Sequence, residues 1–521
     1  METYKQEIKD ETRNIIWKHA INSLTNNRRH IRVLNPDYME HLWAYSKTQL
    51  REYYGDRAHI FNEDIFKDWT EFADTTYQRK KVTELKVAFL CGPEPENDVQ
   101  HLIDLGIRVE NIYAFEYDKS IFQQAVNHLH FTYPRLKIIN GKIEDFVELN
   151  TVIFDIVYLD FTRSLLNEYK TIFKLIDSNV LSELSILVVN TTIPDKTSKN
   201  ISILANYFFY TPTFEYGILQ ENDNTEEDTY GSFSDGCSAF GIDTPEELEP
   251  YIERNFENAY SAFQTNFIIL YSNLIKPVNS VVNSDFLFKR AFKPEKVNDL
   301  LNDKEKIFNW EFYQSESCNP GVHQIIKSAF PDEHFFNVAD KGCKYTRLQS
   351  AYLFDVFQSA EYGKFYHVFS NVLQNAIPKI YNNTIGAMDG LFCDVPMVHL
   401  WLELIINQYG SPYHFNMENH LRYKYRSKSR DMYFDVFTFD RCRALYDWLP
   451  MIEYYGEDLL NIERQIVSRM CMDAIVKHSI YNLHQLYYGS NLVGIYEEDW
   501  SDNHYVPIRR TLLDNNIDTL K

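Results

Sequence analysis

Four short apolar runs between residues 87 and 160 end beside side chains that could bind a ligand. They are the side chains of Glu116, of the neighbours Glu144 and Asp145, and of Asp160, and the first run ends at the backbone of Gly92. In an open parallel sheet, ligands bind outside the carboxyl ends of the strands. A glycine there allows close approach of a ligand, and the carboxylate of Glu116 can accept two hydrogen bonds from a ribose diol. Glu144 or Asp145 could accept a hydrogen bond from the exocyclic amine of an adenine.

The surrounding sequence alternates between short apolar runs and amphipathic stretches. Strands are expected at 87–92, 111–118, 136–140, 154–160 and 184–190. Helices are expected between them, for example over 97–107, where apolar residues recur at helical spacing. Buried strands that alternate with helices are typical of a mostly parallel, doubly wound sheet. The sequence therefore predicts an α/β fold that gathers the four strand ends at one edge.

The order of these elements resembles that of the class I S-adenosylmethionine-dependent methyltransferases, over residues 81–292. The resemblance implies S-adenosylmethionine as the cofactor. It places Gly92 at the methionine portion, Glu116 at the ribose, and Asp145 or Glu144 at the adenine. It also places Asp160 against the substrate, where it would be the catalytic residue. Methyl transfer is an in-line displacement at the sulfonium methyl carbon, so it requires positioning and desolvation more than a dedicated base.

The loop after the first strand departs from the family pattern. It reads LCGPEPEND, with one glycine where the family usually has three, and it adds the acidic side chains of Glu94, Glu96 and Asp98. Negative charge here disfavours the phosphates of a dinucleotide, whereas a ligand with an ammonium and a sulfonium is tolerated. The lost glycines leave an alternative open: a non-catalytic Rossmann-like scaffold or nucleotide sensor within a multi-protein assembly, such as a host-defence system.

The 521 residues exceed what one hydrophobic core usually holds, so several domains are expected. Residues 1–80 are predicted to form a helical region and residues 81–292 the Rossmann-like domain, with its last two strands at 266–275 and 286–292. The acidic stretch 221–236 reads as an exposed loop. Residues 293–521 are expected to form a separate α+β or mainly helical domain, with a short strand at 432–439.

Alternate positions between 422 and 430 carry cations. They are Arg422, Lys424, Arg426, Lys428 and Arg430. On a strand they would share one side and could bind the phosphates of a nucleic acid, helped by interleaved tyrosines. The favoured alternative is pairing with the protein's own carboxylates, such as Asp431, Asp435 and Asp440.

The spacing of His414, Asn416 and His420 matches no metal-site template, so these residues are interpreted as structural and no metal is expected. The seven cysteines form no C-x-x-C pair. The formal net charge of −22 argues against a broadly basic surface or binding to an anionic membrane. Without a signal sequence or a long apolar run, a cytoplasmic protein is expected, with an unknown macromolecular substrate or protein partner.

Overall fold

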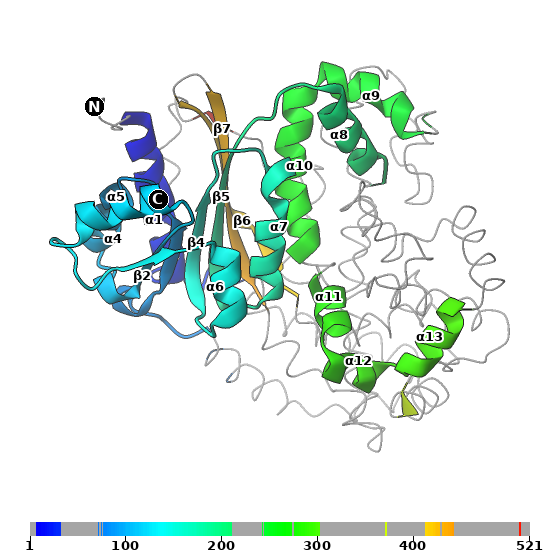
Figure 1. The fold of residues 1–521 in the computed structure, drawn as a ribbon, viewed down its shortest axis with the longest axis horizontal. Coiled ribbons are helices and arrows are strands. Elements are labelled where there is room, and N and C mark those ends of the chain that lie inside the picture. The colour runs from blue at the N-terminus through cyan, green and yellow to red at the C-terminus, as the bar shows by residue number, and fades with distance from the viewer. Residues whose placement is uncertain are drawn as a thin grey trace, which may run out of the picture.

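The computed structural model describes residues 7–32, 77–210, 244–272, 276–302, 412–427 and 430–441, and the short pieces 71, 74, 242, 370–371 and 510–511. At its centre lies one mixed sheet with the strand order β3-β2-β1-β4-β5-β7-β6-β8 (Figure 1). Helices cover both faces of this sheet. The fold is therefore α/β and Rossmann-like.

The first five strands form the parallel core of the sheet. They are β1 (Val87–Leu90), β2 (Ile112–Glu116), β3 (Lys137–Asn140), β4 (Phe154–Asp160) and β5 (Leu181–Thr192). At their carboxyl ends Glu116 stands opposite Asn140, and Asp160 stands opposite Asn190. All five strands were expected from the sequence, and their order confirms the Rossmann-like arrangement.

The sheet continues past β5 with strands from much later in the chain. Strand β7 (Arg430–Asp440) runs antiparallel to β5, and β6 (His414–Ser427) runs antiparallel to β7. Strand β6 thus has the direction of the parallel core, and β8 (Arg510–Thr511) adjoins it in parallel. The strand expected at 432–439 is confirmed, but its assignment to a separate domain is wrong, because it hydrogen-bonds directly to β5.

The two strands expected at 266–275 and 286–292 are wrong. Residues 266–270 belong to helix α10 (Phe256–Leu270), and the second run lies mainly in helix α12 (Asp285–Ala291). Most of α10 is buried, so its sequence shows little helical periodicity, and a short apolar run cannot be told from a buried strand by its pattern alone. The Ser284 hydroxyl caps α12 by accepting a hydrogen bond from the Leu287 N–H.

The helices divide between the two faces of the parallel core (Figure 1). One face carries α1 (Glu7–Leu24), α4 (Glu96–Asp104) and α5 (Lys119–Leu129). The other carries α6 (Ile143–Leu149), α7 (Leu165–Asp177) and α10. The remaining described helices are α8 (Ser198–Tyr210), α9 (Pro245–Arg254), α11 (Lys276–Asn283), α12 and α13 (Pro294–Asn302). A helix in the N-terminal region was expected and is present as α1.

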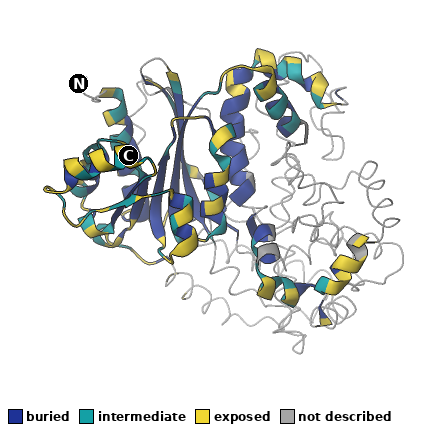
Figure 2. Ribbon diagram, viewed as in Figure 1, coloured by how far each residue is buried: buried dark blue, intermediate teal, exposed yellow. Residues whose placement is uncertain are grey.

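The core of the molecule lies along β4 and β5, which are covered by helices on both sides (Figure 2). Strand β4 is buried from Phe154 to Leu159, and β5 from Leu184 to Thr192. Continuous apolar runs of this kind are typical of strands buried on both faces. The loop expected at 221–236 lies outside the described residues.

Candidate functional site

Three polar side chains, one each from β4, β5 and β6, meet at this edge of the sheet, although β7 lies between β5 and β6. The side-chain amide of Asn190 donates hydrogen bonds to Asp160 Oδ1 at 2.8 Å and to the Tyr425 hydroxyl oxygen at 2.6 Å. A carboxylate only accepts, so the contact with Asp160 settles which end of the amide carries the hydrogens. Asn190 is fully buried, and its Oδ1 has no hydrogen-bond partner in the part of the chain that the structure describes. The C-terminal strand pair thus contributes Tyr425 to the strand-end site.

Helix α1 places a cation at this site. Arg13 Nε lies 3.2 Å from Asp98 Oδ2, and the indole N–H of Trp17 donates to Asp98 Oδ1 at 3.0 Å. The Trp17 ring is completely buried and packs edge-on against Tyr158 and Phe89, with ring centroids 5.3 and 6.4 Å away. Asp98 lies in the first turn of α4, directly after the loop that follows β1. These contacts fix α1 to α4 and to one face of β1 and β4.

The charges in this site act on one another. Burial raises the pKa of Asp160, while the positive charges of Lys9 and Arg13 act against that rise. Burial and the nearby charges of Asp160 and Tyr425 raise the pKa of Tyr158 well above its ordinary value. Burial alone would lower the pKa of Arg13, but Asp98, Tyr158 and Asp160 raise it overall. The site therefore combines one firmly charged guanidinium with two carboxyl groups and two neutral phenols.

Glu116 lies at the end of β2, as expected, and is partly buried. Its Oε1 accepts a hydrogen bond from the Asp118 backbone N–H at 2.8 Å, and burial raises its pKa. Burial also raises the pKa of the Cys91 thiol to about 12, and the charges of Glu116 and Asp98 add to this rise. Next to Cys91, a Cβ added to Gly92 would meet no atom within 4 Å. The backbone at Gly92, directly after β1, thus has open space beside it.

Glu144 and Asp145 both lie in the first turn of α6, on the face of the sheet opposite α1. Glu144 Oε1 accepts a hydrogen bond from the Thr171 hydroxyl of α7 at 3.3 Å, so this side chain joins two helices. Asp145 is exposed. Of the two alternatives for an adenine contact, Asp145 keeps its carboxylate in solvent, while Glu144 is committed to α7.

Three residues of this site, Arg13, Asn190 and Tyr425, were not predicted from the sequence. The strand-end criterion that selected Asp160 applies equally to Asn190, so this residue had a usable signal. Arg13 and Tyr425 carry no such signal, because they come from a helix and a strand that reach the site only through tertiary packing.

Two cations of the basic segment, Arg422 and Lys424, pair with the protein's own carboxylates. Arg422 forms an ion pair with Asp435, with 3.2 Å between Nε and Oδ1, and donates to the Ser261 hydroxyl at 2.8 Å. Lys424 forms ion pairs with Glu257 and Asp431. Arg426 and Arg430 are exposed, and Lys428 lies outside the described residues.

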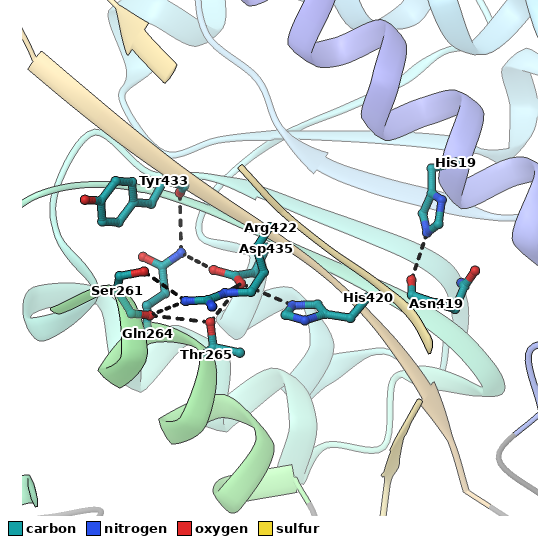
Figure 3. A network of polar contacts seen from close by, with 9 residues as sticks. All are labelled: His19, Ser261, Gln264, Thr265, Asn419, His420, Arg422, Tyr433 and Asp435. Atoms are coloured by element: carbon teal, nitrogen blue, oxygen red, sulfur yellow. Dashed lines mark hydrogen bonds and ion pairs between the residues drawn. The ribbon is translucent and has the colours of Figure 1, made fainter. Parts of the chain in front are cut away.

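The carboxylate of Asp435 is the centre of this network (Figure 3). It accepts hydrogen bonds from the Gln264 amide at 2.7 Å and the Thr265 hydroxyl at 2.9 Å, both on α10. His420 Nε2 lies 3.1 Å from the same carboxylate, and its ring stacks on Phe437. The interpretation of His420 as a structural histidine agrees with these contacts. The described residues contain no group of three side chains that could hold a metal ion.

No family model, no curated protein and no solved structure matches this chain. Its Rossmann-like character therefore rests on the strand order and on the residues at the strand ends. None of the described helices combines the length and the apolar character needed to cross a membrane.

Proposed function

We propose that this protein binds S-adenosylmethionine at the carboxyl ends of β1, β2 and β4 and transfers its methyl group to a macromolecular substrate. The observation that carries the proposal is the strand order together with Glu116 and Asp160 at the ends of β2 and β4. The resemblance to class I methyltransferases extends to the far edge of the sheet. There the reversed strand β7 lies between β5 and β6, two strands that run in the direction of the core.

The charge of the site supports a cationic cofactor. Glu116, Asp98 and Asp160 all lie at this edge, and opposite charges a few ångströms apart attract strongly where water is partly excluded. The sulfonium and ammonium of S-adenosylmethionine suit such a site better than the phosphates of a dinucleotide. In the proposed mode, Oε1 of Glu116 keeps its hydrogen bond from the Asp118 backbone N–H, and Oε2 accepts from the ribose diol.

Asp160 is the proposed catalytic residue. Its side chain is partly buried, its pKa is raised by burial, and Asn190 holds one of its oxygens. A carboxylate with a raised pKa is a better proton acceptor near neutral pH. In the transfer, the acceptor atom attacks the methyl carbon while the bond from carbon to sulfur breaks, and the acceptor's proton passes to Asp160. S-adenosylhomocysteine leaves as the neutral thioether.

The test is isothermal titration with S-adenosylmethionine and S-adenosylhomocysteine. We expect saturable binding that weakens at least about tenfold in Glu116→Ala, because each lost hydrogen bond to a charged group costs about 1.5–3 kcal/mol. The control is Glu246→Ala, which removes an exposed carboxylate from α9 and should bind like the native protein. Absence of binding by the native protein would contradict the proposal and favour the non-catalytic scaffold or nucleotide sensor.

A further inference from the structure

We propose that Arg13, with the hydroxyl groups of Tyr158 and Tyr425, forms a receptor for the carboxylate at the amino-acid end of the ligand. This inference rests on the proposed function, because it assigns one end of the same cofactor to residues outside the strand-end pattern. It brings helix α1 and strand β6 into ligand binding.

The fold leaves hydrogen-bond donors of Arg13 unused. Arg13 is held at Nε by Asp98, and its two terminal nitrogens make no hydrogen bond to any residue that the structure describes. Its side chain keeps 17% of its surface exposed, so the guanidinium can be reached. A guanidinium fixed in this way presents two parallel N–H groups, the geometry that matches a carboxylate.

Two phenol side chains lie near this guanidinium. Tyr158 and Tyr425 both lie close enough to Arg13 and Asp160 to interact electrostatically with them. Within the described part of the chain, the Tyr158 hydroxyl has no hydrogen-bond partner, and the Tyr425 hydroxyl accepts from Asn190 without donating. Burial raises the pKa of both phenols, so they keep their protons and remain donors. Donors gathered around one cation favour an anion.

The carboxyl groups near Arg13 restrict the kind of anion that can bind there. Asp98 and Asp160 lie next to Arg13, so a doubly charged phosphate would meet repulsion from two carboxyl groups. A zwitterion avoids this repulsion, because its carboxylate can face Arg13 while its ammonium lies in the negative field of these carboxyl groups. The free amino-acid end of S-adenosylmethionine is such a zwitterion. The alternative is that Arg13 only clamps α1 to α4 through Asp98.

Two probes separate these roles. S-adenosylhomocysteine carries the amino-acid end, and 5′-methylthioadenosine keeps the nucleoside and the sulfur but lacks that end. We expect Arg13→Gln to weaken binding of S-adenosylhomocysteine roughly 10- to 100-fold in isothermal titration, and to change binding of 5′-methylthioadenosine less than about twofold. Tyr158→Phe removes one hydroxyl and keeps the ring that packs on Trp17, so it tests the receptor without disturbing α1. It should weaken only S-adenosylhomocysteine, by roughly 3- to 10-fold.

Lys18→Gln is the matched control, because it removes one positive charge from an exposed position of the same helix. Equal binding of S-adenosylhomocysteine by the native protein, Arg13→Gln and Tyr158→Phe would overturn the inference. An equal loss for both probes would also overturn it, because Arg13 would then act through the fold alone. If the native protein binds 5′-methylthioadenosine and S-adenosylhomocysteine with the same affinity, the cofactor site stands but the carboxylate receptor does not. Binding of neither probe by the native protein would overturn the proposed function together with this inference.

Discussion

Asp435 on β7 and Arg422 on β6 form a buried ion pair beneath α10, with 3.2 Å between Oδ1 and Nε. The two side chains keep 0% and 5% of their surface exposed. The same carboxylate accepts hydrogen bonds from Gln264 and Thr265 of α10. Because β7 also pairs with β5, this carboxylate connects the helix, the C-terminal strand pair and the parallel core. A basic residue that resembled part of a phosphate-binding ridge therefore serves the fold.

We predict that Asp435→Asn lowers the free energy of unfolding by about 3–5 kcal/mol, because it leaves the Arg422 guanidinium buried without its counter-charge. Urea unfolding followed by circular dichroism measures the change. The matched comparison is Lys424→Met, which removes a more exposed pairing with Glu257 and should cost less than about 1 kcal/mol. If both substitutions lower the free energy of unfolding by the same amount, the buried network contributes no more stability than the more exposed ion pair.

Acid should weaken the attachment of α1. Burial lowers the pKa of His19 from its ordinary 6.5 to about 4, and its ring N–H donates to the Asn419 carbonyl of β6 at 3.0 Å. Between these two pH values the unfolded chain binds a proton that the folded protein does not. Stability is therefore fully present above pH 6.5 and falls as the pH decreases toward 4.

The size of this effect follows from a comparison with His19→Gln, which keeps an N–H donor but cannot titrate. From pH 7 to pH 4.5, the native protein should lose about 2 kcal/mol more of its free energy of unfolding than the variant does. Urea unfolding at both pH values measures the difference. Parallel losses in the two proteins would show that the folded state does not lower the pKa of His19.

Any binding to nucleic acid should depend only weakly on salt. Because Arg422 and Lys424 are engaged internally, at most Arg426, Lys428 and Arg430 remain for phosphates. Each phosphate contact contributes about −0.7 to −0.9 to the slope of log K against log salt, so the slope should be no steeper than about −3. Fluorescence anisotropy with a labelled single-stranded oligonucleotide measures it. A steeper slope would place a basic surface elsewhere on the molecule.

A double variant in the strand pair β6 and β7 provides a second test of nucleic-acid binding. Arg426→Gln with Arg430→Gln should abolish most of that weak binding, whereas Lys424→Gln should leave it within about twofold. If Lys424→Gln proves the more damaging change, its ion pairs with Glu257 and Asp431 must open to admit the nucleic acid.

The sequence by itself determined the parallel half of the sheet. Four of its five strands are mostly buried apolar runs, and amphipathic helices separate all five. Both features are local patterns that can be recognised without knowing which elements pack together. The edge strand β3 is only partly buried. The same patterns placed Glu116 and Asp160 at strand ends. They failed at 266–275, where a helix buried on most sides has the same apolar composition as a strand.

Only the tertiary structure decided what covers the edge of β5 and what completes the site. The pairing of Val188 with Val436 joins residues that are far apart in the chain, and no local pattern encodes such a partner. Arg13 and Tyr425 reach Asp160 for the same reason: the burial of Trp17 positions one, and the pairing of β6 with β7 positions the other. Periodicity reports which face of an element is apolar, but the choice of the surface that it packs against is made by long-range burial and hydrogen bonding.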